Sequence, residues 1–185
     1  MKDILDKVIA FATEAHGEQM RKFSPDRYIV HPIRVMKICR QYTSDLAVLA
    51  AAVLHDVLED TPITPKDMQH FLNAVMDERN AARTMQLVIE LTDVYVKKDY
   101  PWLNRRTRKQ KEIERLIKTS AASQTIKYAD IIDNTGELPQ EDEDDFGYVF
   151  LSECRHLLSK LNGGNPSLYK KAVDCVNEKL LAIRK

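Results

Sequence analysis

Glycine is scarce in this sequence, with five glycines among 185 residues. Folds built from many short strands need tight turns, and glycine is the residue that most readily adopts the backbone angles of such turns. A sustained two-residue alternation of apolar and polar side chains, which would predict half-buried strands, is also missing. The sequence therefore argues against a β fold rich in turns.

Cysteine and long apolar runs are scarce as well. The cysteines are odd in number and too far apart for a Cys-x-x-Cys zinc pattern, at Cys39, Cys154 and Cys175. We interpret them as reduced, mostly buried thiols of a cytoplasmic protein. No apolar stretch approaches the roughly 20 residues that cross a bilayer, and the first residues lack the apolar core of a signal peptide. We therefore expect neither disulfides nor a membrane partner.

Net charge is absent, because 28 Lys and Arg residues balance 28 Asp and Glu residues. The charges are nevertheless unevenly placed: nine basic and three acidic residues lie between Lys97 and Lys118, whereas residues 140–145 are almost wholly acidic. The basic stretch can attract a phosphorylated ligand, or it can form a solvated helix face with acidic neighbours at helical spacing. Its cations are not interleaved with aromatic residues as base stacking would favour, so nucleic acid is not an expected partner.

Apolar residues recur at helical spacing along most of the chain. A first helix can be capped by Asp3, Pro32 suits the first turn of a second, and Ser44 can cap a long apolar helix that Thr61-Pro62 ends. Further helices are predicted from Thr64-Pro65, over residues 78–94, 104–118, 123–138 and 146–161, and from residue 166 to about 183. The sequence thus predicts an all-α fold of about eight or nine helices in one domain, residues 1–185.

The apolar helix that is expected before Thr61 carries two polar pairs, His55-Asp56 and Glu59-Asp60. Residues four apart share a helix face, so these side chains should gather at one buried edge. Burying them costs roughly 2–7 kcal/mol per group unless they are paired or bind a metal, and imidazole with carboxylate is a good ligand set for a divalent transition metal. The run therefore predicts a metal site, and the alternative is a helix end capped by solvated acids.

Two residues alone would leave a metal short of ligands, so further ligands must come from elsewhere. His16 on the first helix, His31 before Pro32, and Asp130 within an apolar-rich helix are candidates. Each is also a residue that could simply be hydrogen-bonded in a core. Spacing alone does not choose among them.

Four segments carry a resemblance to a known family. They are HGEQMRK (16–22), YIVHP (28–32), HDVLEDT (55–61) and KYADIIDN (127–134), with a weaker echo in LNGGN (161–165). In this order they resemble the HD-domain hydrolases of the RelA/SpoT type, and the chain is similar to a small alarmone hydrolase. The resemblance implies a single all-α HD domain that removes pyrophosphate from the 3′ position of guanosine tetraphosphate or pentaphosphate, a small nucleotide substrate, usually with one manganese ion.

The resemblance also implies roles for individual residues. The metal ligands would be His31, His55, Asp56 and Asp130. Glu59 and Asp60 would serve the attacking water, and the nucleotide would be contacted by Arg21, Lys22 and Asn134. Such a ligand set leaves coordination positions for water and a phosphate oxygen, and an acid close to that water can accept its proton.

The sequence departs from the family pattern in two places. The loop at 23–27 lacks the usual glycine and has Arg27 where a proline commonly precedes the tyrosine, and Ile131 and Asp133 replace a basic residue and a His or Tyr. A lost cation and a gained acid should weaken polyphosphate binding. Two alternatives therefore stay open: an HD hydrolase for another nucleotide, such as a dinucleotide 2′-phosphate or a nucleoside monophosphate, and a module that senses a nucleotide without cleaving it.

Overall fold

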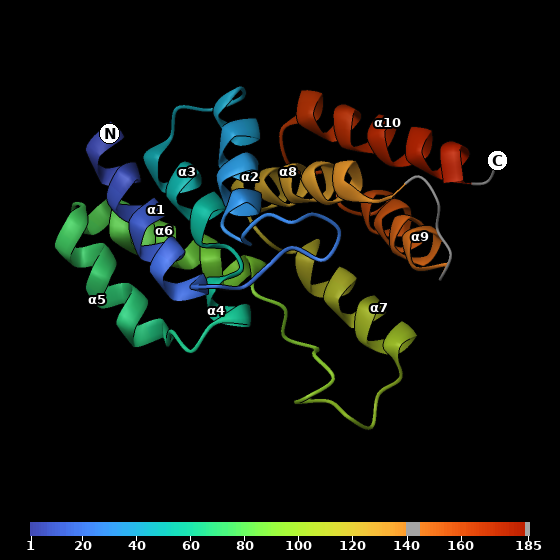
Figure 1. Ribbon diagram of the computed structural model, residues 1–185, viewed down its shortest axis with the longest axis horizontal. Coiled ribbons are helices and arrows are strands. Elements are labelled where there is room, and N and C mark those ends of the chain that lie inside the picture. The colour runs from blue at the N-terminus through green and yellow to red at the C-terminus, as the bar shows by residue number, and fades with distance from the viewer. Residues whose placement is uncertain (140–144, 184–185) are drawn as a thin grey trace. The chain divides into compact units, whose positions relative to one another are not determined.

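The computed structural model describes residues 1–139 and 145–183. In this part of the chain ten helices form, and β pairing is limited to an isolated bridge between Met20 and Arg27 (Figure 1). The predicted all-α class is confirmed. Most of the acidic run, at 140–144, lies outside the described residues.

The chain forms two compact units, Met1–Thr92 and Asp93–Lys185. The first unit contains α1 (Lys2–His16), α2 (Val30–Arg40), α3 (Leu46–Leu54), α4 (Val57–Asp60), α5 (Pro65–Val75) and α6 (Glu78–Leu91). The second contains α7 (Arg105–Leu116), α8 (Ala121–Glu137), α9 (Phe146–Leu158) and α10 (Pro166–Ile183). That the two act as one domain stays a prediction.

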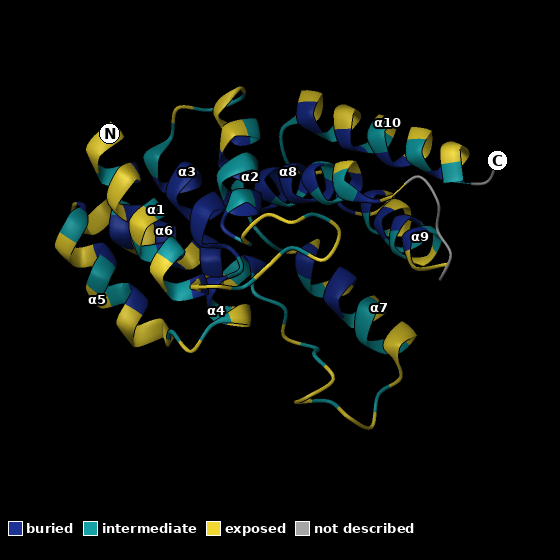
Figure 2. Ribbon diagram, in the orientation of Figure 1, coloured by how far each residue is buried: buried dark blue, intermediate teal, exposed yellow. Residues whose placement is uncertain are grey.

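Helix α3 is the core of the first unit. Every residue from Ala47 to Leu54 is buried, and Figure 2 shows α3 as buried beyond its first turn. A helix that is apolar on all faces needs neighbours on all faces, and α3 packs against α1, α2 and α6. Burying a leucine such as Leu49 or Leu54 stabilises the fold by roughly 1.5–3 kcal/mol. The end of α3 is therefore held firmly in the interior.

Several helices begin just after a side chain that accepts hydrogen bonds from the N–H groups of the first turn. Thr64 caps α5 in a reciprocal pair with Asp67, ahead of Pro65, as predicted. The predicted cap of the apolar helix, Ser44, is wrong, because the Asp45 carboxylate accepts from the N–H groups of Ala47 and Val48. The predicted Asp3 cap is also wrong, since α1 already begins at Lys2 and Asp3 lies in its first turn.

The sequence predicts that the apolar helix continues to Asp60, and this prediction is wrong. The helix ends at Leu54, and a separate four-residue helix, α4, begins at Val57. The interruption gives ten helices, and it separates His55-Asp56 from Glu59-Asp60. His55 is buried, Asp56 is partly exposed, and Glu59 and Asp60 are exposed. The expectation of four polar groups at one buried edge is therefore wrong, because only the first pair enters the interior.

Helix α8 anchors the second unit, where it packs against α10. The buried Tyr128 hydroxyl donates to the Leu161 carbonyl at 2.9 Å and accepts from the Gly164 N–H at 3.1 Å. A Cβ atom at Gly164 would lie 2.6 Å from the Tyr128 ring and 2.8 Å from the Thr125 backbone nitrogen. Glycine is needed here because two backbone segments approach closely.

The three cysteines are free, as predicted, and two of them, Cys39 and Cys154, are buried. Burial raises the pKa of the Cys154 thiol to about 12, so this group stays protonated and unreactive near neutral pH. Among the described residues, no helix has both the length and the apolar character that crossing a bilayer requires.

Two glycine substitutions in the second unit should differ in their effect on stability. Gly164→Ala should lower the free energy of unfolding by about 1–3 kcal/mol, because the added methyl group overpacks against Tyr128 and Thr125. Gly136→Ala is the matched control, since an added Cβ in this exposed position of α8 meets nothing within 4 Å. It should leave stability unchanged or raise it by up to about 1 kcal/mol. Urea denaturation measures both, and equal stability of the two variants would contradict the close approach.

Candidate metal centre

Two histidines and one aspartate of the first unit come from two places in its fold. His31 is the second residue of α2, where the following Pro32 fits because the first turn needs no N–H partner. His55 and Asp56 occupy the break between α3 and α4. The His31 and His55 side chains are 1% and 3% exposed, and the Asp56 side chain is 18% exposed. The buried end of α3 thus brings polar groups into an apolar interior.

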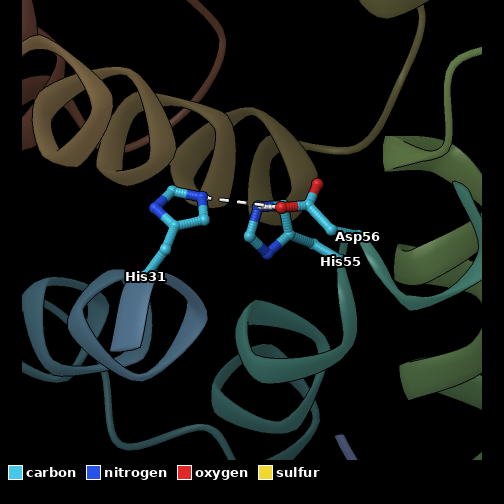
Figure 3. A group of neighbouring side chains, drawn as sticks. All are labelled: His31, His55 and Asp56. Atoms are coloured by element: carbon cyan, nitrogen blue, oxygen red, sulfur yellow. Dashed lines mark ion pairs between the residues drawn. The ribbon is translucent and has the colours of Figure 1, made fainter. Parts of the chain in front are cut away.

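The three side chains converge on one point (Figure 3). The Asp56 Oδ2 atom lies 3.1 Å from His55 Nε2 and 3.5 Å from His31 Nε2. One potential ligand atom from each residue lies within 4.8 Å of the other two. Ligand atoms that share one ion at about 2.1 Å are themselves about 3 to 3.5 Å apart, so this spacing fits a single cation.

The protonation of His55 supports the same interpretation. Its Nδ1 atom lies 3.0 Å from the Ala52 carbonyl oxygen, and because a carbonyl only accepts, the hydrogen bond assigns the proton to Nδ1. A neutral His55 ring then directs the Nε2 lone pair toward the Asp56 carboxylate. Two acceptor atoms 3.1 Å apart need a proton or a metal cation between them. This is the usual arrangement of a metal-binding histidine, whose other nitrogen donates to a carbonyl, and the cluster suggests a divalent metal site.

Asp56 occupies the N-cap position of α4 but does not cap it. No side-chain hydrogen bond from Asp56 satisfies the start of the helix, although aspartate is among the best capping residues. Its carboxylate instead turns toward the two histidines and accepts a hydrogen bond from the Tyr28 hydroxyl at 2.6 Å. The Asp56 side chain therefore contributes to the cluster and not to the start of α4.

Glu59 and Asp60 lie on α4, one turn after Asp56. The backbone N–H groups of both residues donate to the Asp56 carbonyl, at 3.1 and 2.9 Å. The pKa of the Asp60 carboxyl is raised, first because surrounding protein removes part of its hydration and second because the Asp56 charge is near; hydrogen bonds from Tyr28 and Gln19 act in the opposite direction. Asp60 still reaches solvent, so both acids can meet a water molecule.

Arg21 and Lys22 lie in the loop between α1 and α2. The loop is closed by backbone hydrogen bonds from Arg21 to Asp26 at 2.9 Å and from Tyr28 to Gln19 at 2.7 Å. Arg27, which stands where the family has proline, forms an exposed ion pair with Glu18 at 2.7 Å. The loop therefore closes without the family's glycine and proline.

Asp130 and Asn134 belong to α8 in the second unit. The buried Asp130 carboxylate accepts from Asn134 Nδ2 at 2.6 Å and pairs with Lys127 Nζ at 2.8 Å. The structure thus brings together a predicted ligand and a predicted nucleotide contact on one helix. The part of Asp130 in the metal site stays a prediction.

The basic stretch in the second unit is partly used by the fold itself. Arg105, Lys109 and Arg115 form ion pairs with acidic residues of the same unit, Glu153, Asp93 and Glu112. The buried Glu112 also accepts from the N–H groups of Val94 and Tyr95, both at 2.6 Å. For these three cations the structural interpretation is therefore favoured over a phosphate site.

Sequence reasoning missed Tyr28 as a neighbour of the cluster. Tyr28 lies three residues before His31, yet its hydroxyl contacts a carboxylate 28 residues further along the chain, which no local pattern reveals. His16, a candidate ligand, is not part of the ligand group in the described residues. Its Nδ1 atom lies 2.9 Å from Gln19 Oε1, and its ring centroid is 4.7 Å from that of Tyr28.

Comparison with known proteins places these observations in a family. A family model described as HD domain matches residues 9–141. The chain is 35% identical over 133 residues to the guanosine-3′,5′-bis(diphosphate) 3′-pyrophosphohydrolase MESH1 of Mus musculus. This match covers 69% of this chain and 65% of the mouse protein. The chain is 42% identical over 67 residues to a protein of the same enzymatic name from Vibrio cholerae, covering 36% of this chain and 9% of that protein.

A solved structure gives the same result for the fold. It is that of a metazoan ortholog of SpoT that hydrolyses ppGpp, and it matches with a TM-score of 0.78 and 25% identity over 95% of each chain. The sequence match, together with the His-His-Asp cluster, leads to one conclusion: this chain belongs to the HD domain family.

Proposed function

We propose that this protein is a metal-dependent phosphohydrolase that removes the 3′-diphosphate of guanosine tetraphosphate or pentaphosphate. One water is consumed, and the products are pyrophosphate and GDP or GTP. The observation that carries the proposal is the buried group of His31, His55 and Asp56, whose ligand atoms lie within 4.8 Å of one another. The names of the mouse and Vibrio cholerae relatives supply the substrate.

The proposed ligands are His31, His55 and Asp56 of the first unit and Asp130 of the second. Two imidazoles and two carboxylates suit manganese, which we propose as the ion, with one bound per chain. When bound, such a cation polarises a phosphate group and makes a coordinated water more acidic. The protein's own contribution is to hold the ligands in place. The Ala52 carbonyl fixes the His55 ring through a hydrogen bond, and His31 is held as the second residue of α2.

Glu59 and Asp60 are the proposed acid-base residues. Their backbone N–H groups both donate to the carbonyl of Asp56, so both acids are held within one turn of a proposed ligand. The raised pKa of Asp60, caused mainly by lost hydration, makes this carboxyl a better proton acceptor than an ordinary aspartate. A nucleotide sensor would not need both acids beside a metal, and we therefore favour catalysis.

Arg21, Lys22 and Asn134 are the proposed nucleotide contacts. Arg21 can form a fork with phosphate oxygens and Lys22 adds a mobile positive charge. The family's basic residue after Asp130 is Ile131 in this chain, and it is 2% exposed in the core of the second unit. The loss of this cation is the observation that favours a less charged substrate, such as a 2′-phosphorylated dinucleotide or a nucleoside monophosphate, as the second candidate.

A substrate panel tests the proposal directly. Purified protein with manganese should convert guanosine tetraphosphate to GDP and pyrophosphate, which anion-exchange chromatography separates, and it should prefer diphosphate-bearing substrates to monophosphates. If guanosine tetraphosphate stays intact while a 2′-phosphorylated dinucleotide or a deoxynucleoside monophosphate is hydrolysed, the metal chemistry stands and the alarmone assignment fails.

Substitutions at the cluster should separate metal binding from chemistry. Asp56→Ala should abolish both manganese binding, measured by titration calorimetry, and turnover, because it removes the carboxylate between two imidazoles. Glu59→Gln and Asp60→Asn should keep stoichiometric metal and lower turnover by about a hundredfold or more.

Matched controls exist on the exposed face of α1. Asp6→Ala and Glu14→Gln change exposed acids of the same unit and should leave metal binding and turnover unchanged. An Asp56→Ala protein that still binds one manganese ion would remove the basis of the site. Near-normal turnover of the Glu59 and Asp60 variants would refute their acid-base roles.

Neutralising Arg21 and Lys22 together should raise the KM more than it lowers kcat. Both groups would hold phosphate in the ground state and in the transition state, so their loss weakens binding uniformly. Steady-state kinetics of the Arg21→Gln, Lys22→Gln protein measures this. The control pair is Lys37→Gln and Arg40→Gln on exposed positions of α2, and a KM equal to that of this control would show that the loop cations do not bind the substrate.

A further inference from the structure

Tyr28 connects the metal cluster with the loop that carries Arg21. It lies two residues before the start of α2, and its hydroxyl donates to Asp56 Oδ2 at 2.6 Å. This is the same oxygen atom that faces His31 and His55. A hydroxyl bonded to a carboxylate at this distance is a strong, charge-assisted hydrogen bond. Tyr28 therefore restricts the orientation of the Asp56 carboxylate.

The hydroxyl of Tyr28 also lies close to the second acid of α4, where it lowers the pKa of the Asp60 carboxyl. A hydroxyl has a single proton to donate, and the 2.6 Å contact assigns that proton to Asp56. Gln19 also lowers the pKa of Asp60 by hydrogen bonding, and Gln19 Oε1 lies 2.9 Å from His16 Nδ1. The direct action of the hydroxyl is therefore on Asp56.

The ring of Tyr28 has separate neighbours. The Arg21 guanidinium carbon lies 5.3 Å from the ring centroid, within the range of a cation–π contact. The His31 ring lies edge-on at 5.8 Å, and the His16 ring lies at 4.7 Å. The ring therefore contacts both a proposed phosphate-binding residue and a proposed metal ligand.

We propose that Tyr28 is a positioning residue of the hydrolytic site, with two separable actions. Its hydroxyl orients Asp56 toward the cation, and its ring holds Arg21 ready for a phosphate group. The inference rests on the proposed metal-dependent function and deepens it. A tyrosine that served only packing would not need its hydroxyl, and this difference makes the two interpretations testable.

Tyr28→Phe tests the hydroxyl alone. The variant keeps the ring and therefore the Arg21 contact, so manganese should bind about tenfold or more weakly, kcat should fall about tenfold or more at saturating metal, and KM should stay within about twofold. The melting temperature of the metal-free protein should change little. Tyr42→Phe is the matched control, because Tyr42 lies just beyond α2 in the same unit and outside the cluster, and it should behave like the unchanged protein.

Tyr28→Leu tests the ring. It should add a rise in KM to the losses seen with Tyr28→Phe, because Arg21 loses its support. Combined with Arg21→Gln, it should raise KM no further than Arg21→Gln alone, since residues that act through one contact are not additive. An additive effect on KM would overturn the action through Arg21.

Metal affinity keeps this test distinct from that of the proposed function. If the unchanged protein binds manganese but does not cleave guanosine tetraphosphate, the substrate assignment fails while weaker binding by Tyr28→Phe still supports the action on Asp56. If Tyr28→Phe binds manganese as tightly as Tyr42→Phe and turns over equally fast, the positioning role is overturned. If the unchanged protein binds no manganese, the metal site and the role of Tyr28 toward it fail together.

Discussion

The burial of α3 on every side is the constraint on which the site depends. Because residues Ala47–Leu54 are all in the core, the residue that follows them must also begin inside the protein, and that residue is His55. An imidazole can be tolerated there only when its nitrogens are satisfied. The Ala52 carbonyl satisfies one nitrogen, and the other faces Asp56. The apolar helix thus determines how deeply the cluster is buried, and it places a buried ring nitrogen of His55 opposite the Asp56 carboxylate.

The break between α3 and α4 sets the direction of the Asp56 side chain. A continuous helix would have carried Asp56 around the axis with its carboxylate set by the helical period. The interruption lets Asp56 precede α4 as an N-cap residue without capping it. Its carboxylate turns toward His31, the second residue of α2. The buried helix α3 sets the position of His55, and the break before α4 lets the Asp56 carboxylate reach both histidines.

The sequence was informative wherever local chemistry decides structure. The Thr64 cap, the apolar periodicity of the helices and the choice of His55-Asp56 as candidate ligands all depend on residues within one or two turns of each other. The sequence was less informative where two neighbouring residues can fill the same structural role. Ser44 and Asp45 can both cap a helix, and in the structure Asp45 does so. The Tyr28 hydroxyl bond joins residues 28 positions apart, which spacing rules do not cover.

The hydrogen bonds that support His55 and Asp56 differ in how they respond to mutation. Asp56 receives its bond from a side chain, so a single nucleotide change in the codon for Tyr28 can remove it. His55 donates to a main-chain carbonyl at Ala52, and every amino acid supplies such an oxygen. Drift at position 52 can alter packing but cannot delete the acceptor. The hydrogen bond that sets the His55 tautomer is therefore insensitive to substitution at position 52, whereas the one that orients the Asp56 carboxylate depends on the identity of residue 28.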